Sequence, residues 1–139
     1  MSNVVVILKR LKESGYRLTR LREAMIGELG TSKKLLSAGE MIEVLKKRKL
    51  AFHKTSIYRE LDFLIEQGMV KKVNLGDKED RFEFALMPHH HHAVCHKCGD
   101  IQHIDLEEEV RKMEHRLIRQ QFKAERHLVE FFGLCRNCQ

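Results

Sequence analysis

Apolar residues recur at helical spacing in four segments of the first part of the chain, and each segment has a start or stop signal. The spacing predicts helices over residues 3–14, 19–29 and 37–45, and a fourth that begins at Thr55 and ends before Gly68. Thr19 is expected to cap the second helix, and Ser37 with Glu40 forms the capping box of the third. The period then changes to two, which predicts strands over residues 69–75 and 81–86 around a polar turn at 76–80. Helices followed by a β-hairpin are typical of a winged helix.

The second part of the chain has a different order of elements. Short strands are expected at residues 91–95 and 100–104, then a charged amphipathic helix over 105–121, then a strand within 122–134. The helix is expected to turn Val110, Met113, Leu117 and Ile118 inward. The single proline, Pro88, marks a hinge at Met87-Pro88. We therefore predict an α+β protein with a winged helix in residues 1–86 and a small α/β domain in residues 87–139.

Charge is distributed unevenly between these two parts. Residues 1–86 hold 18 Lys and Arg against 12 Asp and Glu, whereas residues 87–139 hold eight of each, so the first part carries the whole net charge of +6. This bias indicates that the helical part binds a polyanion. No apolar run approaches 18 residues and the short one at 4–8 lacks signal-peptide flanks, so we expect a cytoplasmic location with no membrane segment.

Four cysteines form two tight pairs, Cys95-x-x-Cys98 and Cys135-x-x-Cys138. Two thiolates on each of two turns suit tetrahedral Zn²⁺, and a site of four thiolates is closed and therefore structural. The alternatives are a disulfide framework or a redox Cys-x-x-Cys. The absence of an export signal favours zinc over a disulfide.

Four consecutive histidines precede the first cysteine pair. An affinity tag is one alternative, and a solvated strand without metal is another. In a strand, His90 and His92 face one way and His89 and His91 the other, which predicts two metal sites back to back. Glu83 and His103 complete the first, while His127 and a carboxylate from residues 107–109 complete the second. We expect His53, His96 and His115 at the surface or at helix ends.

The open face of the fourth helix carries side chains that suit DNA. Arg and Lys reach phosphates or guanine edges, and Tyr contacts phosphate or a thymine methyl group. The residues concerned are Lys54, Thr55, Tyr58 and Arg59. A solvated helix face is the alternative, and the winged-helix order together with the charge bias favours double-stranded DNA.

With these motifs in this order, the chain resembles the ferric uptake regulator (Fur) family over nearly its whole length. The matching segments are residues 18–22, 37–38, 55–61, 68–70, 81–84, the His-x-His-x-x-Cys-x-x-Cys-Gly block and the ending from His127 to Cys135. The resemblance implies a homodimeric, metal-dependent transcription factor, usually a repressor, in which an α/β dimerisation domain follows the winged helix.

The resemblance also implies roles for single residues. It assigns structural Zn²⁺ to the four cysteines, a regulatory metal to Glu83, His90, His92 and His103, and an extra site to His89, His91, His127 and a carboxylate near Glu109. It implies that Tyr58 and Arg59 contact DNA. Arg20, which lies in the matching segment 18–22, is also predicted to bind DNA.

Two positions depart from the family pattern. A regulatory histidine usually lies two residues before the Ser-Ala pair of the third helix, and this chain has Leu35 there. The regulatory site would then have four ligands, which suits tetrahedral Zn²⁺ somewhat better than six-coordinate Fe²⁺. Peroxide-sensing members tend to have Asp at the positions of His103 and Glu83, so peroxide sensing is disfavoured. Fe²⁺, Zn²⁺ and Mn²⁺ all remain open as the regulatory metal.

The predicted function is metal-responsive repression of metal-homeostasis genes through a near-palindromic operator. One alternative is a family member that binds DNA whatever the metal supply, because Leu35 has uncoupled the switch. Another is a zinc-ribbon interaction module or metal buffer, which would not explain the charge bias. A zinc hydrolase lacks a His-Glu-x-x-His or comparable motif, so we expect neither an enzyme nor a small-molecule substrate.

Overall fold

The computed structural model describes residues 2–32, 35–76, 79–86 and 89–139. The chain forms two compact units, Met1–Met87 and Pro88–Gln139, which are described separately below. The predicted hinge at Met87-Pro88 and the centre of the predicted 76–80 turn, Asp77-Lys78, lie outside the described residues.

Four helices make up most of the first unit: α1 (Asn3–Glu13), α2 (Arg20–Thr31), α3 (Ala38–Lys47) and α4 (Lys54–Glu66). Thr19 caps α2 through its side chain, and the predicted capping box of α3 is formed, because Ser37 Oγ accepts from the Glu40 N–H while Glu40 reaches back to the Ser37 N–H. Helix α4 starts one residue before the expected Thr55. Gly68, with a φ of +68°, follows its last turn as expected.

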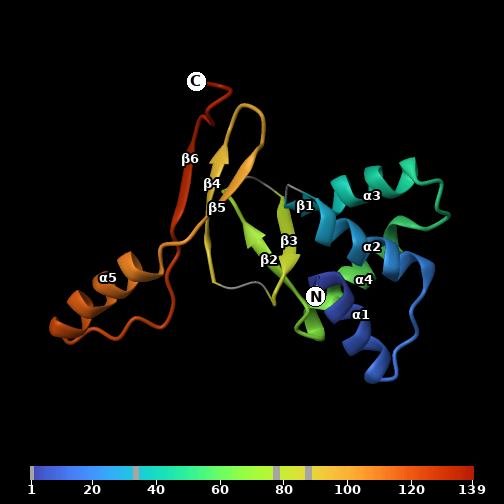
Figure 1. Cartoon of the computed structure of the whole chain (residues 1–139), viewed down its shortest axis with the longest axis horizontal. Coiled ribbons are helices and arrows are strands. Elements are labelled where there is room, and N and C mark those ends of the chain that lie inside the picture. Colours follow the sequence, from blue (N-terminus) through green and yellow to red (C-terminus); the bar gives the residue numbers. More distant parts are fainter. Residues whose placement is uncertain (1, 33–34, 77–78, 87–88) are drawn as a thin grey trace. The chain divides into compact units, whose positions relative to one another are not determined.

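A three-stranded antiparallel sheet completes this unit, with strand order β1-β3-β2 (Figure 1). Its strands are β1 (Leu36–Ser37), β2 (Val70–Asn74) and β3 (Asp80–Phe84). Strands β2 and β3 confirm the predicted hairpin, and the unit is a winged helix. The sequence did not predict β1, because two residues are too short to show an alternating pattern.

One hydrophobic core fills the winged helix. The most deeply buried side chains come from the inner faces of all four helices: Ile7, Leu11, Met25, Ile26, Met41, Leu45, Ile57, Leu61 and Leu64. Phe82 and Phe84 of β3 close the core on the side of the sheet. The helical faces predicted from apolar spacing therefore form the core, and each buried Leu or Ile contributes about 1.5–3 kcal/mol.

Arg22 connects α2 to α4 in the interior of this unit. Its Nη2 donates to Glu60 Oε2 at 3.1 Å, its Nε donates to the other Glu60 oxygen, and its Nη1 donates to the Arg17 carbonyl at 2.7 Å. The guanidinium also lies over the Phe63 ring, 4.1 Å from the centroid. A bidentate pair of this kind fixes direction as well as distance, so Arg22 sets the orientation of α4.

The second unit is a three-stranded mixed sheet with one helix (Figure 1). Its strands are β4 (His91–Cys95), β5 (Ile101–Ile104) and β6 (Glu130–Gly133), and its helix is α5 (Glu107–Arg119). In the sheet β4 lies between β5 and β6. Strand β4 pairs antiparallel with β5 and parallel with β6. Strand β6 is shorter than the predicted segment.

The apolar face of α5 corrects one expectation. Val110 is buried as expected, but Met113 is 48% exposed and Ile118 is 61% exposed, so these two side chains do not point into a core of the single chain. Phe131 and Phe132 of β6 are also about half exposed. A unit of this size has too little surface of its own to cover all of these side chains.

Candidate metal centres

The turn after β4 and the segment after β6 bring the four cysteines together. The Sγ atoms of Cys95, Cys98, Cys135 and Cys138 lie within 4.8 Å of one another, and Cys98 Sγ is 3.7 Å from Cys135 Sγ. Two sulfurs on a tetrahedral Zn²⁺ with Zn–S of about 2.3 Å would be about 3.8 Å apart. The donor set and its spacing therefore fit zinc.

The pKa values of these thiols also favour a bound cation. Backbone N–H groups of Cys135 and Cys98 lower the pKa of Cys95 to about 6, so this thiol loses its proton readily. Hydrogen bonding to Cys135, together with burial and the other thiols, raises the pKa of Cys138 to about 12. Four thiolates at this spacing repel one another, and a divalent cation at their centre removes that penalty.

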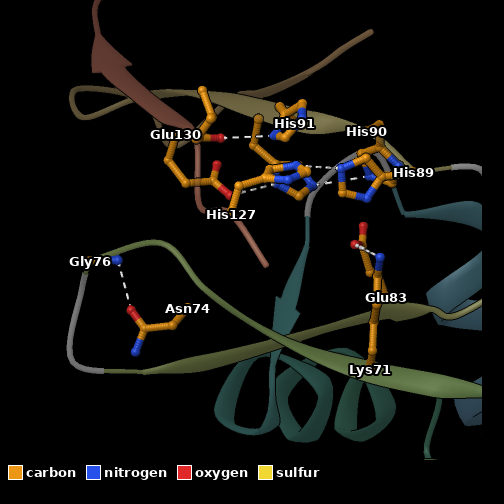
Figure 2. A network of polar contacts seen from close by, with 11 residues as sticks. Lys71, Asn74, Gly76, Glu83, His89, His90, His91, His127 and Glu130 are labelled. Atoms are coloured by element: carbon orange, nitrogen blue, oxygen red, sulfur yellow. Dashed lines mark hydrogen bonds and ion pairs between the residues drawn. The ribbon is translucent and has the colours of Figure 1, made fainter. Parts of the chain in front are cut away.

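A second cluster joins His89, His91 and His127, whose ring nitrogens lie within 4.8 Å of one another (Figure 2). His89 Nε2 is 2.9 Å from His127 Nε2. The Val129 carbonyl accepts from Nδ1 of His91 at 3.2 Å, which leaves Nε2 of a neutral ring with a free lone pair. That buried Nε2 has no hydrogen-bond partner among the described residues, so its lone pair is available to a metal.

The carboxylate expected near Glu109 is not part of this cluster. Instead, Glu114 Oε1 lies 3.5 Å from Nδ1 of His127. Glu109 and Glu114 are five residues apart on α5, so they project from different sides of the helix. The spacing along the sequence could not choose between them, because the path of residues 120–129 back to β6 determines which turn of α5 meets His127.

A third cluster lies on the other face of β4, as alternation along the strand predicts. His92 and His103 are paired across β4 and β5, and ligand nitrogens of these two residues and of His90 lie within 4.8 Å of one another. His90 Nε2 is 3.1 Å from His92 Nε2. Two imidazole nitrogens on one ion are separated by about 3.0 Å at a right angle and about 3.4 Å in a tetrahedron, given metal–N distances of about 2.1 Å. Both geometries therefore fit this pair.

Glu83 and Leu35 belong to the first unit. Glu83 is 4% exposed on β3, and its carboxylate pairs with Lys71 Nζ at 3.2 Å (Figure 2). Leu35 is 6% exposed, so the residue at the family's histidine position contributes an apolar side chain to the interior of the winged helix. Carboxylate oxygens bind Zn²⁺ and other divalent metals, so Glu83 remains a candidate ligand by its chemistry.

The predicted DNA-binding residues share the open side of α4. Lys54, Thr55, Tyr58 and Arg59 are exposed, and Tyr58 keeps 54% of its surface accessible. They lie opposite the core residues of the same helix, as the spacing predicts. Arg20, the first residue of α2, is exposed as well.

The three remaining histidines lie where they were expected. His53 is the exposed residue that precedes α4, His96 is exposed in the turn after β4, and His115 is exposed on α5. None of the three belongs to a metal-ligand cluster in the described part of the chain.

Comparison with known proteins matches these features to one family. The model of the ferric uptake regulator family matches residues 13–132. The ferric uptake regulation protein of Bacillus subtilis is 33% identical over 138 residues, and the match covers 95% of this chain and 91% of the Bacillus protein. The peroxide operon regulator of the same organism is 31% identical over 133 residues, and the match covers 94% of this chain and 90% of that regulator.

A solved structure is similar over nearly the full length of the chain. The Helicobacter pylori ferric uptake regulator Fur superposes with a TM-score of 0.80 at 26% identity, covering 98% of this chain and 93% of that one, and its structure is described as revealing three functional metal binding sites. The protein belongs to the ferric uptake regulator family of metal-responsive transcriptional regulators. No helix in the described residues is long and apolar enough to span a membrane.

Proposed function

We propose that this protein is a homodimeric, metal-dependent repressor that binds a near-palindromic operator when a regulatory metal is present. One observation carries the proposal: three clusters of metal-ligand side chains lie in a unit that is attached to a positively charged winged helix. Metal sites alone would suit a buffer, and a basic winged helix alone would suit a constitutive DNA-binding protein. Their combination in one chain supports a regulator.

The four cysteines would hold structural Zn²⁺. A closed tetrahedral site supplies folding free energy and has no open position for catalysis. It would fix the chain end that follows β6 to the turn after β4, and so stabilise the sheet that carries the histidines.

The regulatory metal, Fe²⁺ or Zn²⁺ with Mn²⁺ as a further candidate, would be held by Glu83, His90, His92 and His103. Glu83 lies on the wing strand β3 and the histidines lie in the second unit, so one ion bound by all four would join the two units. Such an ion selects one arrangement of the units from the available ones. A coupling free energy of about 1–3 kcal/mol would change DNA affinity by about 5–150-fold. Because Leu35 replaces a further ligand, we expect coupling at the weaker end.

The cluster of His89, His91 and His127 would form an additional site in the second unit. The free Nε2 of buried His91 supports metal binding there. Since its ligands all come from one unit, this metal would stabilise that unit and would not connect the two.

On DNA, α4 would enter the major groove. Lys54, Thr55, Tyr58 and Arg59 would contact phosphates and base edges, and Arg20 would contact the backbone. Two copies are needed to read a near-palindromic site, and the exposed apolar side chains of α5 and β6 supply a surface on which two copies could pair.

The test measures the affinity of the protein for a DNA duplex taken from the region upstream of its own gene. The cysteine zinc is retained, the histidine sites are stripped, and Fe²⁺, Zn²⁺ and Mn²⁺ are titrated separately without oxygen. We expect one metal to raise DNA affinity, by a factor toward the lower end of about 5–150-fold. The Glu83→Ala variant should keep the basal affinity and lose most of that gain, while Lys123→Ala, a change at an exposed residue of the second unit, should keep both.

Other outcomes would contradict the proposal in distinguishable ways. Tight duplex binding that no metal alters would support the metal-independent DNA-binding alternative. Metal binding without salt-sensitive duplex binding would support the metal-buffer alternative. A full metal response in Glu83→Ala would exclude the bridging role of this carboxylate.

A further inference from the structure

Glu130 on β6 meets the imidazole of His92 on the neighbouring strand. We propose that Glu130 is a positioning residue for the metal site of His90, His92 and His103, and that it orients the His92 ring so that Nε2, and not Nδ1, is the atom that binds the ion. The inference rests on the proposed function of that histidine cluster. Nothing in the spacing along the sequence singles out Glu130, because it lies 38 residues from His92.

The sheet register brings the two side chains together. Strands β4 and β6 run parallel, and His92 is the register partner of Glu130. Glu130 Oε1 is 3.4 Å from His92 Nδ1, at the long end of the hydrogen-bond range. His92 is 3% exposed and the Glu130 side chain is 13% exposed, so water competes little for this contact.

The chemistry of the contact fixes which nitrogen faces the metal. A carboxylate can only accept, so Nδ1 of His92 must carry the hydrogen. In the neutral ring the lone pair then lies on Nε2, and this is the atom that lies 3.1 Å from His90 Nε2. A carboxylate behind a metal-binding imidazole also raises the basicity of the ring.

The second oxygen of Glu130 supports the same role. Glu130 Oε2 is buried and has no hydrogen-bond partner among the described residues (Figure 2 shows the side chain beside the histidines of β4). A buried, incompletely bonded carboxylate is unfavourable in the absence of positive charge. A divalent ion at the histidine cluster supplies that charge, so the burial of Glu130 is best compensated when the metal is bound.

Glu130→Leu and Glu130→Gln test this role. Both are made in a His127→Ala background, which disables the other histidine cluster, and the cysteine zinc is retained. We expect Glu130→Leu to weaken Zn²⁺ and Fe²⁺ binding by about 10–100-fold, measured by chelator competition. Glu130→Gln should weaken metal binding less than Glu130→Leu does, because the amide oxygen of Gln still accepts a hydrogen bond from Nδ1 of His92. Glu125→Leu, which changes an exposed carboxylate of the same unit, should bind metal as the background does.

The ¹⁵N NMR spectrum of the metal-free histidine site gives a second readout that a purely structural role would not move. His92 should be in the Nδ1–H tautomer in the background protein and should lose this preference in Glu130→Leu. Unchanged metal affinity in both variants overturns the inference. Weaker binding with an unchanged His92 tautomer also overturns it, because Glu130 would then act without orienting the ring.

Failure of the inference is separable from failure of the proposed function. If the background protein binds metal at its histidines and the Glu130 variants bind it equally well, only the positioning role is wrong. If the background protein binds no metal there, both are wrong. If metal binds and depends on Glu130 but leaves DNA affinity unchanged, the proposed function is wrong and the positioning role holds.

Discussion

At the scale of single residues, three imidazoles of the second unit share one bonding arrangement. Nδ1 of His91, His92 and His127 each faces an acceptor, which is the Val129 carbonyl, Glu130 and Glu114 respectively. An acceptor at Nδ1 places the free lone pair of a neutral ring on Nε2. The strand and its neighbours therefore prepare the ligand atoms before any ion arrives, which lowers the cost of ordering them on binding.

The exposed side of α4 allows a prediction for one side chain. Arg59→Ala should weaken operator binding by about 1–3 kcal/mol if Arg59 contacts a base edge. If Arg59 contacts a phosphate instead, the slope of the logarithm of the binding constant against the logarithm of the salt concentration should fall in magnitude by about one. Fluorescence anisotropy at several salt concentrations measures both effects. Lys123→Ala, which also removes one exposed positive charge, should change neither, and an Arg59→Ala protein with wild-type affinity would contradict the assignment.

At the scale of elements, the direction of α4 depends on its partner helix. Arg22→Ala would leave the Glu60 carboxylate, 12% exposed, without its bidentate partner. We expect the free energy of unfolding to fall by about 1.5–3 kcal/mol, as for other hydrogen bonds to charged groups. Denaturant titration measures this loss, and operator affinity should fall as well because α4 loses its orientation.

The matched comparison is an exposed ion pair in the same unit. Lys46 lies 3.6 Å from Glu43, with side chains 55% and 69% exposed, so Lys46→Ala should cost at most about 0.5–1 kcal/mol. A double-mutant cycle on Arg22 and Glu60 should give a coupling of about 0.5–3 kcal/mol. Additive effects of the two single changes would show that the pair does not hold α4.

Strand β6 depends on the cysteine cluster at its end. Cys138→Ser should reduce bound zinc from one ion to none per chain and, by releasing the end of β6, should also weaken metal binding at the histidines. Zinc quantification and chelator competition measure the two effects. Histidine-site affinity that survives complete zinc loss would contradict this dependence.

At the scale of the whole molecule, the exposed apolar side chains of α5 and β6 predict that two copies associate. Ile118→Asp places a charge at the most exposed apolar residue of α5 without touching a buried side chain. We expect sedimentation to show a shift from dimer to monomer and a loss of operator affinity. Lys9→Asp, an exposed change in the winged helix, should remain dimeric, and a dimeric Ile118→Asp protein would place the interface elsewhere.

The sequence alone predicts the parts of the molecule that rest on local rules. Helix caps at Thr19 and Ser37, the hairpin, and the division of the four consecutive histidines between two clusters all follow from spacing and residue type. The parallel register that sets Glu130 beside His92 does not follow, because nothing local determines it. The contact between Glu114 and His127 and the exposure of Ile118 also depend on tertiary packing.

The central claim is that regulatory metal binding and DNA binding are coupled, and thermodynamic reciprocity tests it most directly. The measurement is the affinity of the histidine sites for the activating metal, with the cysteine zinc retained, in the presence and absence of saturating operator duplex. Our account predicts that the duplex tightens metal binding by the same factor, about 5–150-fold, by which the metal tightens DNA binding. Equal metal affinity with and without the duplex would contradict it.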